Sequence, residues 1–225
     1  MKYLLTLLFI MLIIPSTCFA QAVDSPFSIF GGLAMPQGDF GDDDDLEDCG
    51  NAKTGFGAGI NYTTQLTNPD LSWISSISFL MNGWDEDMLE EEWGEDTKID
   101  AGSWINIPIM SGIKYQTSIS PTMQIYLLGQ GGLNIVKAPS LEASYYDDYD
   151  EEWYKDELEW DTGSSFGFTF GGGIVLTDKI SIGLRYYSLG EPEIEGEYKS
   201  EDDDSEKIEW EGPISILLVM VEISF

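Results

Sequence analysis

The segment Ile214-Ser-Ile-Leu-Leu-Val-Met-Val-Glu-Ile-Ser-Phe225 decides the fold, because its side chains alternate in character with a period of two residues. One face is wholly apolar and consists of Leu217, Val219, Val221, Ile223 and Phe225. Glu222 and Ser224 fall on the opposite face. This alternation is typical of a β-strand that lies between two environments. We expect the apolar face to meet lipid and the polar face to point into a barrel.

Seven other segments share this low charge and a high content of Ile, Phe, Tyr, Trp and Gly. They are Phe27–Pro36, Gly55–Thr67, Leu71–Trp84, Trp104–Ser120, Met123–Lys137, Ser165–Thr177 and Ile180–Gly190. None contains the unbroken apolar run of about 18 residues that a membrane helix needs, whereas about 9–11 residues suffice for a tilted membrane strand. The sequence therefore predicts an all-β chain with eight membrane strands.

The connections between these segments alternate in length. Three are short and rich in turn residues, namely Asn68-Pro69-Asp70, Pro121-Thr122 and Asp178-Lys179. Four are long, namely Gln37–Thr54, Asp85–Ser103, Ala138–Ser164 and Glu191–Pro213. Antiparallel up-and-down outer-membrane barrels combine short periplasmic turns with long extracellular loops in this way. The pattern predicts a barrel with both termini in the periplasm.

The acidic residues follow the same division. The chain carries a net charge of −31, and 37 of its 41 Asp and Glu residues lie in the four long connections. A charge on the lipid face of a barrel costs about 2–4 kcal/mol near the bilayer midplane, so membrane strands exclude such residues. The acidic surface also excludes nucleic acid as a partner, because it repels phosphate. A hydrophobic content of 43% argues against a disordered acidic chain.

The first 20 residues have the organisation of a secretory signal peptide. Met1-Lys2 gives a positive start, Tyr3–Pro15 is almost wholly apolar, and small residues precede a cut expected after Ala20. The apolar run is too short for a membrane helix. We therefore expect a signal peptide over residues 1–20 and one barrel domain over residues 21–225.

After this cleavage Cys49 would be the only cysteine, so no intrachain disulfide is expected. The chain contains no histidine. Catalysis by a Ser-His-Asp or Cys-His arrangement is therefore excluded, and so is the commonest zinc ligand. We expect a protein that is not an enzyme.

An alternating strand that ends in Phe225 resembles the C-terminal signal of outer-membrane barrels. With eight segments and alternating connections, nearly the whole mature chain resembles the small outer-membrane barrels of the OmpA transmembrane-domain and OmpX kind. This resemblance implies an outer-membrane location and an architecture, but it carries no function-defining motif.

Three charged residues fall on the inward face of the predicted barrel, namely Lys114, Arg185 and Glu222. An unpaired charge in a narrow lumen is disfavoured, so we expect Arg185 to pair with Glu222, with Lys114 as a further partner. The cluster is either a satisfied polar core or a gate that controls ion leakage. Aromatic residues near the strand ends are expected to form interfacial girdles at the lipid surface. They are Tyr62, Trp73, Trp84, Trp104, Tyr115 and Tyr186.

The long connections contain runs of acids that are candidates for cation binding. The candidates are Asp42, Asp43, Asp44, Asp45, Asp147, Asp148, Asp150, Asp202, Asp203 and Asp204. Clustered carboxylates suit hard cations such as Ca²⁺, but none of these runs has the spacing of a calcium loop. We expect a diffuse, weak association with Ca²⁺ or other divalent cations and no defined metal site or cofactor.

Apolar and acidic residues alternate within the last long connection, where Ile194-Glu-Gly-Glu-Tyr198 is mirrored by Ile208-Glu-Trp210-Glu. This predicts a hairpin beyond the membrane, with Glu201–Ser205 near its tip. Its aromatic residues form either a cross-strand ladder or a recognition surface for a basic protein or cationic ligand.

The sequence as a whole predicts a monomeric barrel in outer-membrane lipid, with a surface-interaction or envelope-structural role for its acidic loops. The alternative is a narrow channel for cations or small solutes, drawn by the acidic mouth. Bulky inward residues such as Met110, Tyr126 and Leu128 favour the closed barrel.

Overall fold

The computed structural model describes residues 26–42, 49–85, 98–120, 123–147, 152–200 and 205–225. Eight antiparallel strands form a closed barrel in the order β1-β13-β10-β9-β6-β5-β3-β2. They are β1 (Phe27–Pro36), β2 (Gly55–Gln65), β3 (Leu71–Gly83), β5 (Ser103–Ser120), β6 (Met123–Lys137), β9 (Thr162–Thr177), β10 (Ile180–Ser188) and β13 (Ser215–Ser224). This confirms the predicted barrel and its strand number. The expected signal peptide lies outside the described residues.

Two of the short connections are held by side-chain hydrogen bonds typical of tight turns. Between β2 and β3, the backbone N–H of Asp70 donates to Asn68 Oδ1 over 3.0 Å. Between β9 and β10, the Thr177 hydroxyl oxygen accepts from the N–H groups of Lys179 and Ile180. These turns mark one end of the barrel, which we call the turn end. The third short connection, residues 121–122, lies outside the described part of the chain.

The outer surface of the barrel is apolar. Each barrel strand contributes exposed large hydrophobic side chains, for example Leu33, Ile60, Ile77, Ile113, Leu127, Phe170, Leu184 and Val221. Their neighbours in sequence are buried or half-buried and point inward, as the period-two pattern predicts. A continuous apolar belt around the outside of a protein marks contact with lipid or another apolar partner. Among the described residues, no helix is long and apolar enough to cross a bilayer.

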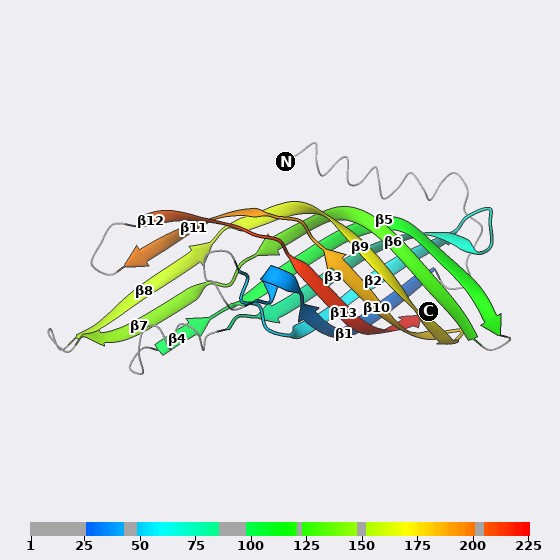
Figure 1. Ribbon diagram of the computed structural model, residues 1–225, viewed down its shortest axis with the longest axis horizontal. Coiled ribbons are helices and arrows are strands. Elements are labelled where there is room, and N and C mark those ends of the chain that lie inside the picture. The colour runs from blue at the N-terminus through cyan, green and yellow to red at the C-terminus, as the bar shows by residue number, and fades with distance from the viewer. Residues whose placement is uncertain (1–25, 43–48, 86–97, 121–122, 148–151, 201–204) are drawn as a thin grey trace.

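Five additional strands prolong the opposite end of the barrel (Figure 1). They are β4 (Lys98–Ala101), β7 (Leu141–Asp147), β8 (Glu152–Trp160), β11 (Glu193–Ser200) and β12 (Glu206–Glu211). They form one sheet in the order β12-β11-β8-β7-β4, which we call the rim sheet. The predicted hairpin in the last long connection is confirmed as β11–β12, with Ile194 opposite Trp210.

Each rim strand continues a barrel strand after a break of one to four residues. The rim order repeats the barrel order β13-β10-β9-β6-β5, so five adjacent strands rise beyond the barrel as a half-wall. The strands β1, β2 and β3 have no such continuation among the described residues. Three of the four long connections therefore contain strands, and these strands pair with one another.

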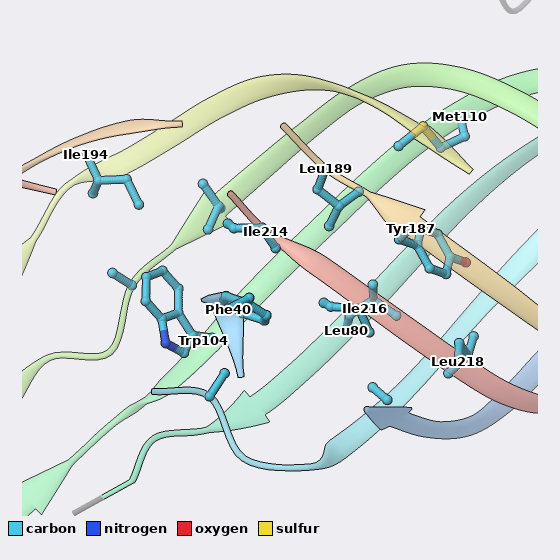
Figure 2. Close-up of a cluster of buried hydrophobic side chains, with 14 of the residues drawn as sticks. Phe40, Leu80, Trp104, Met110, Tyr187, Leu189, Ile194, Ile214, Ile216 and Leu218 are labelled. Atoms are coloured by element: carbon cyan, nitrogen blue, oxygen red, sulfur yellow. The ribbon is translucent and has the colours of Figure 1, made fainter. Parts of the chain in front are cut away.

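The lumen is filled by side chains from all around the barrel. A large buried cluster occupies the half nearer the rim sheet, and Figure 2 shows it with residues from the barrel strands and the connection after β1. A smaller cluster of Ile74, Tyr126 and Leu128 lies separately. Glycine makes room for the largest rings: a Cβ atom on Gly183 would lie 2.2 Å from the Tyr126 hydroxyl. Eight-stranded barrels are narrow enough for side chains to close them in this way.

Candidate functional site

A pocket of about 670 Å³ opens at the rim end, between the rim sheet and the mouth of the barrel. This volume is in the range that accommodates a small organic ligand. Side chains of the rim strands alternate between the two faces of the sheet with the same period as those of the barrel strands. Their apolar side chains lie on the face that continues the lumen, and most of their charged side chains lie on the other face. The pocket is lined mainly by aliphatic and aromatic residues, among them Ile99, Trp104, Leu141, Leu158, Trp160 and Trp210. We call it the rim pocket.

The base of the rim pocket is built from the connection after β1. A short 3-10 helix, η1 (Gly38–Phe40), turns Phe40 into the barrel mouth, where its ring packs edge-on against Trp104 with 5.4 Å between centroids. Figure 2 shows these two rings side by side. Trp104 also contacts Trp210, and its indole N–H donates to the Gly50 carbonyl over 2.7 Å. These contacts join the connection after β1 to β5 and β12.

One carboxylate lies among these apolar side chains. Asp156, on β8, is only 8% exposed and lines the rim pocket. Its Oδ2 atom accepts a hydrogen bond of 2.7 Å from the hydroxyl of Tyr198, on β11. Its Oδ1 atom is buried and has no hydrogen-bond partner among the described residues. A buried polar atom without a partner costs about 1–3 kcal/mol, so this oxygen is a site where a ligand donor would be favourable.

Two lysines hold together the charged face of the rim sheet. Lys155 on β8 bridges Glu142 on β7 and Glu157 on its own strand, with distances of 2.9 and 2.7 Å. Hydrogen bonds to Glu157 and Glu142 raise the pKa of Lys155 to about 12. Lys199 on β11 binds Glu159 on β8 over 2.9 Å, and this hydrogen bond raises the lysine pKa. Both lysines are therefore paired with acids on the face opposite the rim pocket.

The lumen holds the predicted pair of Arg185 and Glu222. Arg185 is fully buried, and its Nη2 atom lies 3.6 Å from Glu222 Oε2. The other oxygen of Glu222 accepts hydrogen bonds from the Ser28 hydroxyl and, over 2.9 Å, from the Asn61 amide. The guanidinium carbon lies 4.2 Å from the centroid of the Phe30 ring, a cation–π distance. The structure thus joins four strands around this pair.

Lys114 does not complete the cluster as expected. Its ammonium lies 4.6 Å from the centroid of the Tyr126 ring, and no ion pair joins it to Glu222 among the described residues. The Lys114 ammonium is attracted to the face of the Tyr126 ring in place of the expected ion pair with Glu222.

Most of the candidate cation-binding acids lie outside the described part of the chain. Asp42 is described and exposed, and Asp147 is the last residue of β7. The others, Asp43, Asp44, Asp45, Asp148, Asp150, Asp202, Asp203 and Asp204, lie outside the described residues. Within the described ranges, no group of three or more acids or cysteines has the geometry to hold a metal ion.

Two expected girdle aromatics are instead part of the rim site, so their assignment was wrong. Trp104 is 3% exposed and Trp84 packs against the same buried cluster. The sequence already indicated that Trp104 points inward, because it lies an even number of residues from the inward residues Asn106 and Met110 on the same strand. Asp156 was also missed. Asp156 shares one face of its strand with Leu158 and Trp160. An acid in an acid-rich stretch gives no other local sign of burial.

No protein-family model matches the chain, and no curated protein matches it. Several solved structures are similar to it, among them the following three. Neisserial surface protein A has 14% identity and a TM-score of 0.38, with 89% of this chain and 98% of that one covered. The attachment invasion locus protein Ail of Yersinia pestis has 16% identity and a TM-score of 0.41, with coverage of 90% and 100%. The outer membrane protein OprG of Pseudomonas aeruginosa has 11% identity and a TM-score of 0.47, with coverage of 89% and 96%.

Proposed function

We propose that this chain is a non-enzymatic outer-membrane barrel that binds a ligand at the cell surface through its rim sheet. The observation that carries the proposal is the rim sheet. Its five strands extend beyond the barrel, and their apolar face lines a pocket above a filled lumen. A strand extension that served only as a spacer would have no need of an aromatic pocket with a buried carboxylate.

The membrane location is supported by the apolar belt and by the placement of charge. Lys137, at the rim end of β6, is the only charged residue exposed on a described barrel strand. Lys114, Arg185 and Glu222 face the lumen. In outer-membrane barrels the short turns face the periplasm, which directs the rim sheet outward.

The packed lumen argues against the alternative of a cation or solute channel. Tyr126 and Tyr187 are almost fully buried in the interior, as are Met110 and Arg185. Ser78 on β3 and Tyr187 on β10 are not on neighbouring strands, and their hydroxyl groups meet across the lumen at 3.2 Å. A conducting pathway would require this contact to separate.

Planar-bilayer recording of the refolded mature chain tests the sealed barrel. We expect no stable conductance steps above the lipid baseline. Protease protection of the barrel in matched vesicles is the control that shows insertion. Regular conductance steps from inserted protein would contradict the proposal and support the channel.

A further inference from the structure

We infer that the rim pocket binds an organic cation, namely a primary ammonium carried on an apolar or aromatic body, with Asp156 as its counter-ion. This inference rests on the proposed function, because it assigns a ligand class to the same pocket. Asp156 is the acid whose burial and missing partner distinguish it from the exposed acids of the rim sheet.

One oxygen of the Asp156 carboxylate is available to accept a hydrogen bond from a ligand. Tyr198 already donates to Oδ2, which fixes the orientation of the group, while Oδ1 has no partner in the described part of the chain. A buried carboxylate is stabilised most by a donor that also carries positive charge. Because the free site is an acceptor, a cationic ligand must bring an N–H group to it, so a primary ammonium fits better than a quaternary one.

The surroundings of Asp156 suit the apolar part of such a ligand. Trp104, Trp160 and Trp210 line the pocket together with aliphatic residues from β4, β7 and β12. Aromatic faces attract ammonium groups by about 0.5–2 kcal/mol and also bury apolar carbon. A hard cation such as Ca²⁺ is disfavoured, because it needs six to eight oxygen ligands, whereas this lining is largely hydrocarbon.

The charge of the protein also favours a cationic ligand. The net charge of −31 concentrates cations near the surface. The lysines of β8 and β11 are paired with acids on the opposite face, so neither of them neutralises Asp156.

Tryptophan fluorescence of the protein, refolded in a non-ionic detergent, tests the inference with two probes of the same shape. Phenethylammonium carries the charge and 2-phenylethanol is its neutral counterpart. We expect saturable binding of phenethylammonium that persists in 0.5 M NaCl and is at least about tenfold tighter than that of 2-phenylethanol. The added salt removes the diffuse attraction of the exposed acids.

Three variants test whether the preference for the ammonium probe comes from the carboxylate of Asp156. Asp156→Asn keeps the size of the side chain and an oxygen for Tyr198 but removes the charge, so we expect the tenfold preference for the ammonium to disappear. Glu193→Gln removes an exposed acid from the other face and should bind both probes as the wild type does. Tyr198→Phe removes the internal hydrogen bond but leaves the charge, and should keep most of the preference.

Equal binding of the two probes by the wild-type protein would overturn the inference while leaving a rim pocket that binds ligands. Absence of binding for both probes would overturn the proposed function as well. Should Asp156→Asn fail to refold, the wild-type preference in salt and its retention by Tyr198→Phe decide the question. Preference that survives in a folded Asp156→Asn protein would place the counter-ion elsewhere and contradict the assignment.

Discussion

Arg185 and Glu222 form a buried ion pair that is only partly satisfied. Glu222 is held by Ser28 and Asn61, but the guanidinium makes one contact of 3.6 Å and stacks on Phe30. Within the described ranges, all three guanidinium nitrogens of Arg185 lack a hydrogen-bond partner. A buried pair of this kind adds little net stability, but the loss of one partner leaves the other charge uncompensated.

We therefore predict that Arg185→Met lowers the free energy of unfolding by about 3–5 kcal/mol. Adding Glu222→Gln to this variant should recover part of the loss, because the remaining buried charge is removed. Urea unfolding of the barrel in phospholipid vesicles measures both effects. Lys137→Met, which removes an exposed charge from β6, is the control and should change stability by less than about 0.5 kcal/mol. An unchanged stability in Arg185→Met would contradict this account of the lumen.

At the scale of the elements, the rim sheet depends on a few cross-strand pairs between strands rich in acid. Lys155 joins β7 to β8, and Lys199 joins β8 to β11. Both side chains are exposed, so each pair contributes modestly and is weakened by salt. Their importance lies in position, because they interrupt rows of like charge between adjacent strands.

We predict that the ion pairs of Lys155 with Glu142 and Glu157 contribute to stability in a way that depends on pH. The folded pKa of Lys155 is raised from 10.5 to about 12, so its contribution is complete below 10.5 and is lost as the pH rises through about 12. The hydrogen bond from Lys155 lowers the pKa of Glu157 from 4.5, so that contribution is present above 4.5 and is lost as the pH falls below it. The stabilising effect should therefore be greatest between these limits.

Comparison of Lys155→Met with the wild type isolates this effect from the general repulsion among the acids. The difference in thermal midpoint of the rim tryptophan signal should be small, largest between pH 4.5 and 10.5, and smaller in 1 M NaCl. Lys179→Met, at the turn end, should show no such profile. A difference that stays constant from pH 4 to pH 12 would rule out the ion pairs as its source.

The barrel strands could be predicted from the sequence because two local signals coincide in them. Period-two alternation sets the facing of each strand, and turn residues such as Asn68 and Asp178 set its ends. The β11–β12 hairpin was predictable for the same reason. The pairing of β8 with β11 was not, because it joins separate connections whose local patterns carry no information about their neighbours.

The candidate site was predictable only in part. The pairing of Arg185 with Glu222 follows from a general rule, since two opposite charges in a narrow lumen must meet. Asp156 belongs to a stretch where acids are common, and it is buried within the rim sheet, where Tyr198 on β11 donates to it. Trp104 was misplaced because an aromatic residue at a strand end is stable at a lipid interface as well as in a packed pocket.

The whole molecule combines two ends with different roles. The turn end is compact and closed by short connections, and the barrel wall is apolar outside and packed inside. The rim end carries the half-wall, the rim pocket and most of the described acids. We propose that the rim sheet faces the outside of the cell and that the turns face the periplasm.

Labelling of single cysteines in intact cells tests this claim most directly. In a Cys49→Ser background, Glu195→Cys places a thiol on the exposed face of β11 and Asp178→Cys places one in the β9–β10 turn. The reagent is a maleimide on a polymer too large to cross the outer membrane, and the background protein should remain unlabelled. We expect Glu195→Cys to react in intact Gram-negative cells and Asp178→Cys to react only after the outer membrane is permeabilised. Labelling of Asp178→Cys but not Glu195→Cys in intact cells, or recovery of both proteins in the soluble fraction, would contradict the account.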